Sequence, residues 1–228
     1  MKKDLPNVKK TKLKKCFWPV ILIVLIVFMS ALVFITHRPR RYAPIRVADH
    51  NQASRYLTNQ LLPTIYNNSQ LGKPFEVVIT QDGLNDILAR WPHPIKLQNI
   101  VLTDPQVLLL PQQIILMATT NLETVDLVLA IELNPTITPQ GLMNLHINTV
   151  TLGAVNITAV ARLIGDKAYL SWMSSTGTDP NSIVARVCRS LLNNEPFEPA
   201  FEIGDESWRI SKMEVAANKI TVLLTPSH

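Results

Sequence analysis

The stretch ETVDLVLAIELN, residues 123–134, decides the expected fold because its apolar side chains recur at every second position. In an extended chain, successive side chains point to opposite faces, so one face would be aliphatic and the other mixed. The aliphatic face would carry Val125, Leu127, Leu129, Ile131 and Leu133, and the mixed face Thr124, Asp126, Val128, Ala130, Glu132 and Asn134. This pattern predicts a half-buried antiparallel strand.

Further strands are expected on both sides of this stretch. Residues 135–141 would turn, and residues 142–152 would return with Met143, Leu145 and Ile147 alternating. Apolar runs at 96–103, 106–110 and 113–122 precede them, and runs at 201–203, 208–215 and 220–225 follow. Because the two central strands would exceed the usual length of about 5–6 residues, we expect a long, open, curved antiparallel sheet.

Helices are expected to be few. Residues 53–66 have helical spacing, with Pro63 expected to bend or end the helix. A second helix would follow Gln81 and carry Leu84, Ile87 and Leu88. A third, capped by Asn156, would be weakened at Gly165, and a fourth would start at Asp179-Pro180. The expected class is therefore α+β, with the curved sheet packed on a few helices.

Residues 17–36, FWPVILIVLIVFMSALVFIT, form an apolar run without a charge. A helix of this length covers roughly 30 Å, the thickness of the hydrocarbon core of a bilayer. A buried core helix is the alternative, but it would need protein cover on every side. The sequence predicts a single-pass transmembrane helix.

The charges beside this run predict its orientation. Seven lysines precede it, whereas the arginines that follow it are Arg38, Arg40, Arg41 and Arg46. The excess on the N-terminal side favours a cytoplasmic N-terminus. No small-x-small cleavage site follows the run, so we expect an uncleaved signal-anchor in the cell membrane.

This topology divides the chain into four parts. Residues 1–16 would be a cytoplasmic basic tail, residues 17–36 the span, residues 37–48 an extended stalk without packing, and residues 49–228 an extracytoplasmic α+β domain. All the excess of positive charge lies before residue 42, because the remainder has twelve Lys and Arg against sixteen Asp and Glu. Basic residues placed beside an apolar run indicate a membrane and not nucleic acid.

No motif for chemistry is recognisable. The five histidines lack the spacing of metal ligands, and no nucleophile elbow, P-loop or dinucleotide-binding glycine pattern occurs. We therefore expect no catalytic residues, no metal and no cofactor, and a protein that is not an enzyme.

A short motif carries a resemblance to a known family. Val77-Val78-Ile79-Thr80 is followed by Leu84-Asn85-Asp86-Ile87-Leu88, and a strand pair surrounds residues 135–141. With the order of elements over residues 50–225, this resembles the YpmS-like membrane-anchored proteins of bacteria, which are similar to the tubular lipid-binding (TULIP-like) superfamily. The resemblance implies a curved sheet around a helix with an apolar groove between them, and implies no functional residue.

Two functions are compatible with these expectations. The first is binding of a lipid or other apolar ligand in a groove between the helix and the aliphatic face; a fully packed core is the simpler alternative. The groove residues would be Leu84, Ile87, Leu88, Val125, Leu127, Leu129, Ile131 and Leu133. The second is a structural or assembly factor that docks a membrane partner protein, whose identity the sequence does not specify.

Overall fold

The computed structural model describes residues 13–47, 52–91, 94–97, 100–122, 125–177 and 179–227. Most of the basic tail expected over 1–16 lies outside these residues, and so does the expected boundary between stalk and domain at 48–49.

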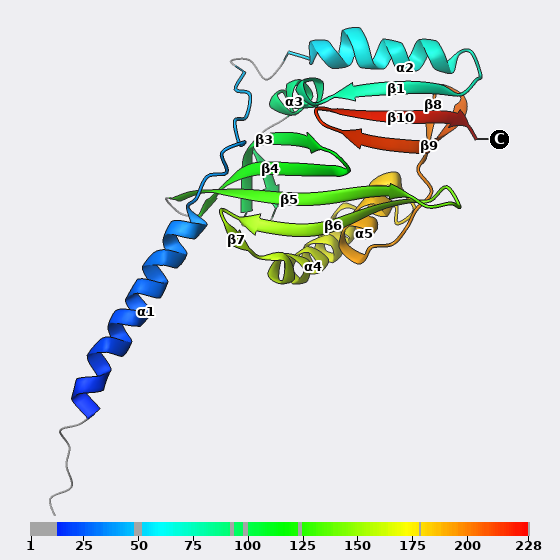
Figure 1. Ribbon diagram of the computed structural model, residues 1–228. Helices are drawn as coiled ribbons and strands as arrows, with labels where there is room; N and C mark the ends of the chain where they lie inside the picture. The colour runs from blue at the N-terminus through cyan, green and yellow to red at the C-terminus, as the bar shows by residue number, and fades with distance from the viewer. Residues whose placement is uncertain are drawn as a thin grey trace, which may run out of the picture.

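Helix α1 (Leu13–Ile35) extends away from the rest of the chain (Figure 1). The large apolar side chains described between Leu22 and Phe34 are all exposed, each by 41% or more. Within the residues described, no helix combines the length and the hydropathy that crossing a membrane requires. The span expected over 17–36 stays a prediction, and its first residues have no described side chains.

The described strands form two antiparallel sheets, which lie one above the other in Figure 1. Sheet A has the order β1 (Phe75–Thr80), β10 (Lys219–Pro226), β9 (Glu206–Ala216), β8 (Ala200–Ile203). Sheet B has the order β2 (Ile95–Leu97), β3 (Ile100–Leu110), β4 (Gln113–Leu122), β5 (Val125–Ile137), β6 (Met143–Leu152), β7 (Val155–Asn156).

The α+β class is confirmed, but the prediction of one long curved sheet is wrong, because there are two sheets and neither is curled. The difference arises at β1, which pairs with β10 and not with the long strands that follow it. Val77 lies opposite Val222, almost the whole length of the domain away in sequence. A pairing between such distant segments leaves no local pattern in the sequence.

The main core lies between the two sheets. Val77, Val222 and Trp208 of sheet A share it with Val107 and Leu109 of β3. Trp208 is fully buried, and Phe75 meets its ring edge-on at a centroid distance of 5.1 Å. We call the side of each sheet that faces this core its inner face, and the opposite side its outer face.

The outer face of sheet B is covered by the segment that follows α1. Tyr42 packs there on Met117, Val128 and Ala130 and is only 6% exposed. Its hydroxyl donates to the Asp104 carbonyl (2.7 Å) and lies 2.7 Å from the Thr119 hydroxyl. Residues 37–47 of the expected stalk form neither helix nor strand and turn where the Tyr42 amide donates to the Pro39 carbonyl (3.0 Å), and the expectation that the stalk makes no packing contacts is wrong at Tyr42.

The C-terminal end of α1 is held by the turn between β6 and β7. The amide of Ala154 donates to the Phe34 carbonyl (2.8 Å), and the Gly153 amide donates to the Val128 carbonyl (2.8 Å). Gly153 has φ +59°, and a Cβ at this position would lie 2.0 Å from the Ile35 carbonyl oxygen. Only glycine allows the turn to approach the helix end this closely.

A π-helical turn, η1 (Leu57–Leu61), leads into helix α2 (Leu62–Ser69). Pro63 was expected to bend or end this helix, but the helical chain continues past it to Ser69, and Pro63 lies just after the point where the π-helical turn becomes α2. The Tyr56 hydroxyl accepts from the Thr80 amide (3.1 Å) and donates to the Val78 carbonyl (3.4 Å). Tyr56 therefore covers the free edge of β1.

Helices α4 (Thr158–Thr176) and α5 (Ile183–Asn193) lie beside β6. Helix α4 continues through Gly165, which was expected to weaken it, and this glycine faces Leu192 of α5, where a Cβ would lie 2.6 Å from the leucine side chain. Helix α5 is capped by Ser182, whose hydroxyl accepts from the Ala185 amide (3.3 Å), so the helix begins at Ile183 and not at Asp179-Pro180 as predicted.

The edge of β6 is closed by α5 and the chain that follows it. The Leu145 amide donates to the hydroxyl of Ser190, which is fully buried (2.9 Å). Met143 and Phe197 exchange two backbone hydrogen bonds (2.7 and 2.9 Å). These contacts satisfy an edge that would otherwise be open to another strand.

Candidate functional site

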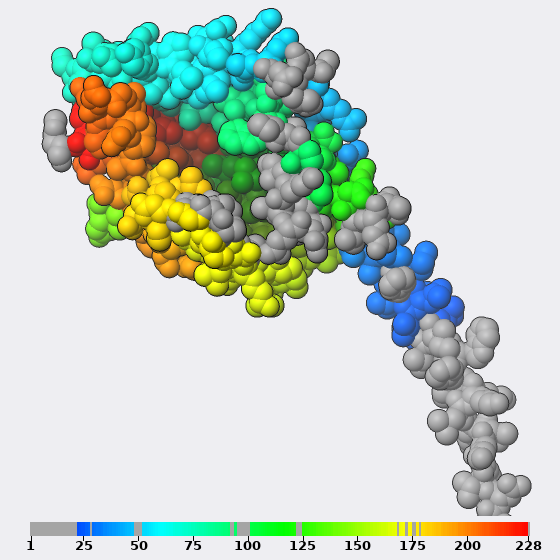
Figure 2. Space-filling view, turned by 180° about the vertical axis from the view of Figure 1, so that it is seen from behind, coloured from blue at the N-terminus to red at the C-terminus, as the bar shows by residue number. Residues whose placement is uncertain are grey.

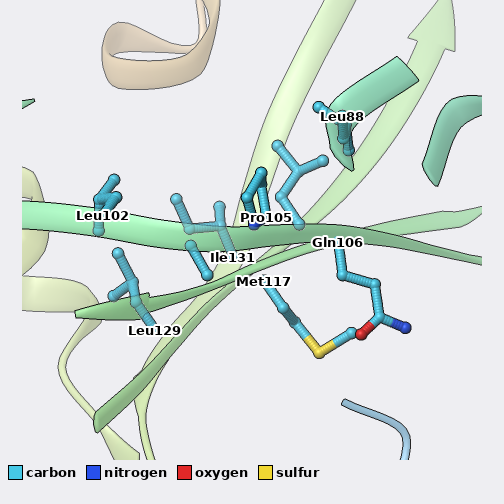
Figure 3. A pocket seen from close by; sticks show the side chains of 9 residues that line it. Leu88, Leu102, Pro105, Gln106, Met117, Leu129 and Ile131 are labelled. Carbon is cyan, nitrogen blue, oxygen red and sulfur yellow. The ribbon is translucent and has the colours of Figure 1, made fainter. Parts of the chain in front are cut away.

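A pocket of about 230 Å³ lies between the C-terminal end of helix α3 (Gln81–Ala89) and the inner face of sheet B (Figure 3). The atoms exposed to it are almost all apolar. Its lining comes from α3, β3, β4 and β5: Leu88, Leu102, Pro105, Gln106, Leu116, Met117, Ala118, Leu129 and Ile131.

The strand register builds the floor of the pocket. Leu129 lies directly opposite Ala118, and Ile131 lies opposite Leu116, so all four side chains share the inner face. Ala118 is the smallest of the four and leaves space that a larger side chain would fill.

A β-bulge in β3 forms one side of the pocket. The register of β3 against β4 shifts between Thr103 and Gln106, and Asp104 has φ 48°. Asp104-Pro105 was expected to separate two strands, but it forms a bulge within one. Proline donates no ladder hydrogen bond and is therefore tolerated at such a position, where it turns its ring toward the pocket.

Helix α3 is fixed above the pocket by two polar side chains one helical turn apart. Asn85 accepts from the Val107 amide (2.7 Å) and donates to its carbonyl (2.9 Å), and Gln81 accepts from the Leu109 amide (2.7 Å). Beyond the residues that pair with β2, these two side-chain amides supply the hydrogen bonds that a neighbouring strand would make with the edge of β3. The start of α3 is capped by Thr80, whose hydroxyl accepts from the Gly83 amide (3.1 Å).

Three of the eight residues predicted for the groove line this pocket: Leu88, Leu129 and Ile131. Leu84 packs in the main core, Ile87 is half-buried, and Leu127 and Leu133 are buried outside the lining. Val125 is 42% exposed at the start of β5 and lies outside the lining as well.

Residues of β3 and β4, such as Leu102, Pro105 and Ala118, also line the pocket and were not predicted from the sequence. The hydrogen bonds of Gln81 and Asn85 to β3 were not predicted either. Their spacing was a usable signal, because polar residues at i and i+4 beside Leu84 and Leu88 on an amphipathic helix indicate a partner for the amides.

Gln106, the polar residue of the lining, already makes hydrogen bonds to the backbone of the segment that follows α1. Figure 3 shows its side chain and that of Met117 extending away from Leu88. The Gln106 amide accepts from the Ala43 amide (2.7 Å) and donates to the Arg41 carbonyl (3.1 Å). The side chains that remain in the lining offer neither a hydrogen bond nor a charge to an occupant.

The surrounding surface is hollowed. Figure 2 shows a recess between the segment that contains α2 and α3 and the yellow α4, with green strand residues at its bottom. Sheet B therefore presents part of its inner face to the outside at this place, in contrast to the part that packs against sheet A.

The titratable groups with shifted pKa values are structural. The Ser54 hydroxyl donates to Asp86 and, together with Arg90 (3.0 Å), holds the pKa of that carboxyl below its usual value. Burial raises the pKa of Tyr42. Within the described part of the chain, no group of three or more His, Cys, Asp or Glu residues is arranged to hold a metal ion.

Comparisons with known proteins assign no family. No family model matches this chain, and no curated protein matches it either. The resemblance to YpmS-like proteins therefore stays a prediction, based on the sequence motif at residues 77–80 and 84–88.

Proposed function

We propose that α1 anchors this protein in a membrane and that its domain holds an apolar chain, such as the acyl chain of a lipid, without converting it. The observation that carries the proposal is the pocket between α3 and sheet B. Its floor is aliphatic, and its one amide side chain is directed to the opposite face and already bonded. An apolar ligand gives up no hydrogen bonds to water when it enters such a site, whereas a polar substrate would lose its hydrogen bonds to water without replacement.

The size of the pocket limits what it holds. Small-molecule sites usually measure about 300–1,000 Å³. At about 230 Å³ the pocket accommodates part of one alkyl chain and not an entire lipid. The recess outside it in Figure 2 would leave the headgroup in solvent. This arrangement fits a protein that holds or passes on a lipid more than one that encloses it.

The proposed anchorage rests on α1 and its flanking charges. The described apolar side chains of α1 are exposed, and a helix that is apolar all round requires cover by lipid or protein. The lysines before it favour a cytoplasmic N-terminus and an extracytoplasmic domain in the cell membrane. A reporter fused after His228 that is active only outside the cytoplasm should be active; inactivity in a well-expressed fusion would contradict the orientation.

The ligand is tested by photochemical labelling of the full chain in lipid vesicles. A phospholipid with a diazirine on one acyl chain is activated by light, and labelled peptides are identified by mass spectrometry. We expect label on the strands that carry Leu102, Ala118 and Leu129, in addition to label on α1. Ala118→Leu fills the pocket and should remove the label from the strands but not from α1.

Ala130→Leu is the matched control, because Ala130 lies next to Leu129 but on the outer face, against Tyr42. It should keep the strand label and lower the free energy of unfolding by about 1–3 kcal/mol through overpacking. Label confined to α1 in the folded parent protein would contradict ligand binding. The alternative, a structural or assembly factor that docks a membrane partner protein, would then be preferred.

A further inference from the structure

We infer that helix α4 lies on the surface of the same bilayer that α1 crosses, with its exposed apolar side chains in contact with lipid. This inference rests on the proposed anchorage by α1, and it is independent of whether the pocket holds a ligand. It concerns a second membrane contact, made by a helix within the domain.

Helix α4 is apolar on two sides, and the domain covers only one of them. The covered side includes Thr158, whose hydroxyl accepts from the Val150 amide (2.9 Å), and Gly165, which faces Leu192. The other side carries four large apolar residues, which we call the α4 stripe: Val160 (56% exposed), Leu163 (63%), Ile164 (47%) and Leu170 (66%). Positions i, i+3, i+4 and i+10 fall on one side of a helix, so the four residues share that side, with Lys167 at i+7 between Ile164 and Leu170.

The position of α4 relative to α1 indicates what covers the stripe. The Ala154 amide binds the last turn of α1 at the Phe34 carbonyl, and α4 begins at Thr158, directly after the short strand β7. Figures 1 and 2 both place α4 on the side of the domain from which α1 extends. If α1 crosses a bilayer, the membrane surface passes close to Ile35 and therefore close to the start of α4.

Basic side chains that could contact anionic headgroups are exposed near this level, although α4 also exposes Asp166 beside Lys167. Arg38, Arg40 and Arg41 are exposed directly after α1. Lys167 is exposed in the middle of the stripe, where its long side chain can reach phosphate while its methylene groups remain among the apolar residues. An interfacial helix combines such a face with basic residues and lies about 5–10 Å into the headgroup and acyl boundary.

The test places a fluorescent label at single cysteines in the full chain, in a background with Cys16→Ser and Cys188→Ala. The protein is reconstituted into vesicles of phosphatidylcholine and phosphatidylglycerol. Leu163→Cys reports on the stripe, and Leu71→Cys is the control, because Leu71 is similarly exposed (67%) but follows α2. Leu25→Cys reports separately on α1. Spin-labelled phospholipids and aqueous iodide serve as the two quenchers.

We expect the label at 163 to be quenched several-fold more by spin-labelled lipid than the label at 71, and to be protected from iodide. Lys167→Glu should reduce this lipid quenching, whereas Lys73→Glu, beyond α2, should not. Val160→Cys repeats the measurement in case Leu163→Cys fails to fold.

Three outcomes would overturn the inference. Quenching at 163 by iodide, as at 71, would show a stripe in water. Protection of the label at 163 from both quenchers would show protein cover, such as a second copy of this chain. In both cases lipid quenching at 25 would leave the anchorage intact. Absence of lipid quenching at 25 would overturn the anchorage itself and the α4 inference with it.

Discussion

Sheets A and B share one core but differ on their outer faces. In sheet A the outer face is exposed, as Glu76, Val78 and Lys212 show. In sheet B the outer face is covered by Tyr42 and the segment around it, so that Leu127 and its neighbour Val128 are both buried (3% and 4% exposed).

This difference explains where alternation predicts burial and where it fails. In β10, Ile220, Val222 and Leu224 alternate in sequence and are buried, as one covered face requires. In β5 the residues assigned to the mixed face, Val128 and Ala130, are more buried than Leu129 and Ile131, which border the pocket. Apolar residues at every second position of a strand indicate which side chains are buried only when one face of the sheet is covered and the other is exposed.

The largest expected effect separates the packed part of the core from the pocket. Leu109 of β3 is 1% exposed, whereas Leu129 borders open space. Leu109→Ala should lower the free energy of unfolding by about 2–5 kcal/mol. Leu129→Ala should cost clearly less, since it enlarges a space that already exists. Urea titration of both variants checks this, and equal losses would mean that the pocket is as well packed as the core.

The next effect tests the cover on the outer face of sheet B. Tyr42→Phe keeps the ring but removes the hydroxyl that binds the Asp104 carbonyl and the Thr119 hydroxyl. Leaving these groups without their partner should cost about 1–3 kcal/mol. Denaturant titration measures the loss; an unchanged midpoint would show that the segment contributes little to stability.

The same variant has a characteristic pH dependence. Burial raises the pKa of Tyr42 above its ordinary value of 10.0, so the folded state retains the proton longer than the unfolded chain. The stabilisation is complete below about pH 10 and is lost as the pH rises through the higher pKa of the folded state. The stability advantage of the parent over Tyr42→Phe should therefore be constant below pH 10 and shrink above it. An advantage that grows above pH 10 would contradict the burial of this hydroxyl.

The smallest effect compares the two outer faces by one substitution. Val128→Thr places a hydroxyl under Tyr42 and should cost about 1 kcal/mol, the lower end of the penalty for a buried polar group, because Thr119 lies directly opposite as a partner. Val78→Thr, at a position 51% exposed in sheet A, should change stability by less than about 0.5 kcal/mol. Thermal unfolding of the pair measures the difference, and equal effects would remove the distinction between the faces.

Much of the fold could be predicted, because many helices and strands have a recognisable pattern of apolar residues in their own sequence. The strand pair around 135–141 and the strands at 208–215 and 220–225 follow from runs and alternation of apolar residues, and the helix after Thr80 follows from the spacing of Leu84, Ile87 and Leu88. The pairing of β1 with β10 and the packing of Tyr42 join segments far apart in sequence. Nothing in the local pattern of either segment specifies such a partner.

Only the residues of the candidate site that lie on segments with a clear amphipathic pattern could be predicted from the sequence. Leu88, Leu129 and Ile131 come from two segments whose amphipathic patterns are visible in the sequence. Pro105 and Ala118 enter the lining through a bulge and a strand register, which depend on the neighbouring strands. A small residue such as Ala118 gives no signal in sequence for the space that it leaves.

The pairing of β1 with β10 also sets the order of events during synthesis. Helix α1 and β1 are made early, but the partner strand of β1 is Lys219–Pro226, which follows every other strand. Sheet A can therefore close only after nearly the whole domain has left the ribosome, and pairings between such distant segments form slowly. Until then Val77 and Phe75 lack their cover, and the unfinished domain is exposed to aggregation and proteases.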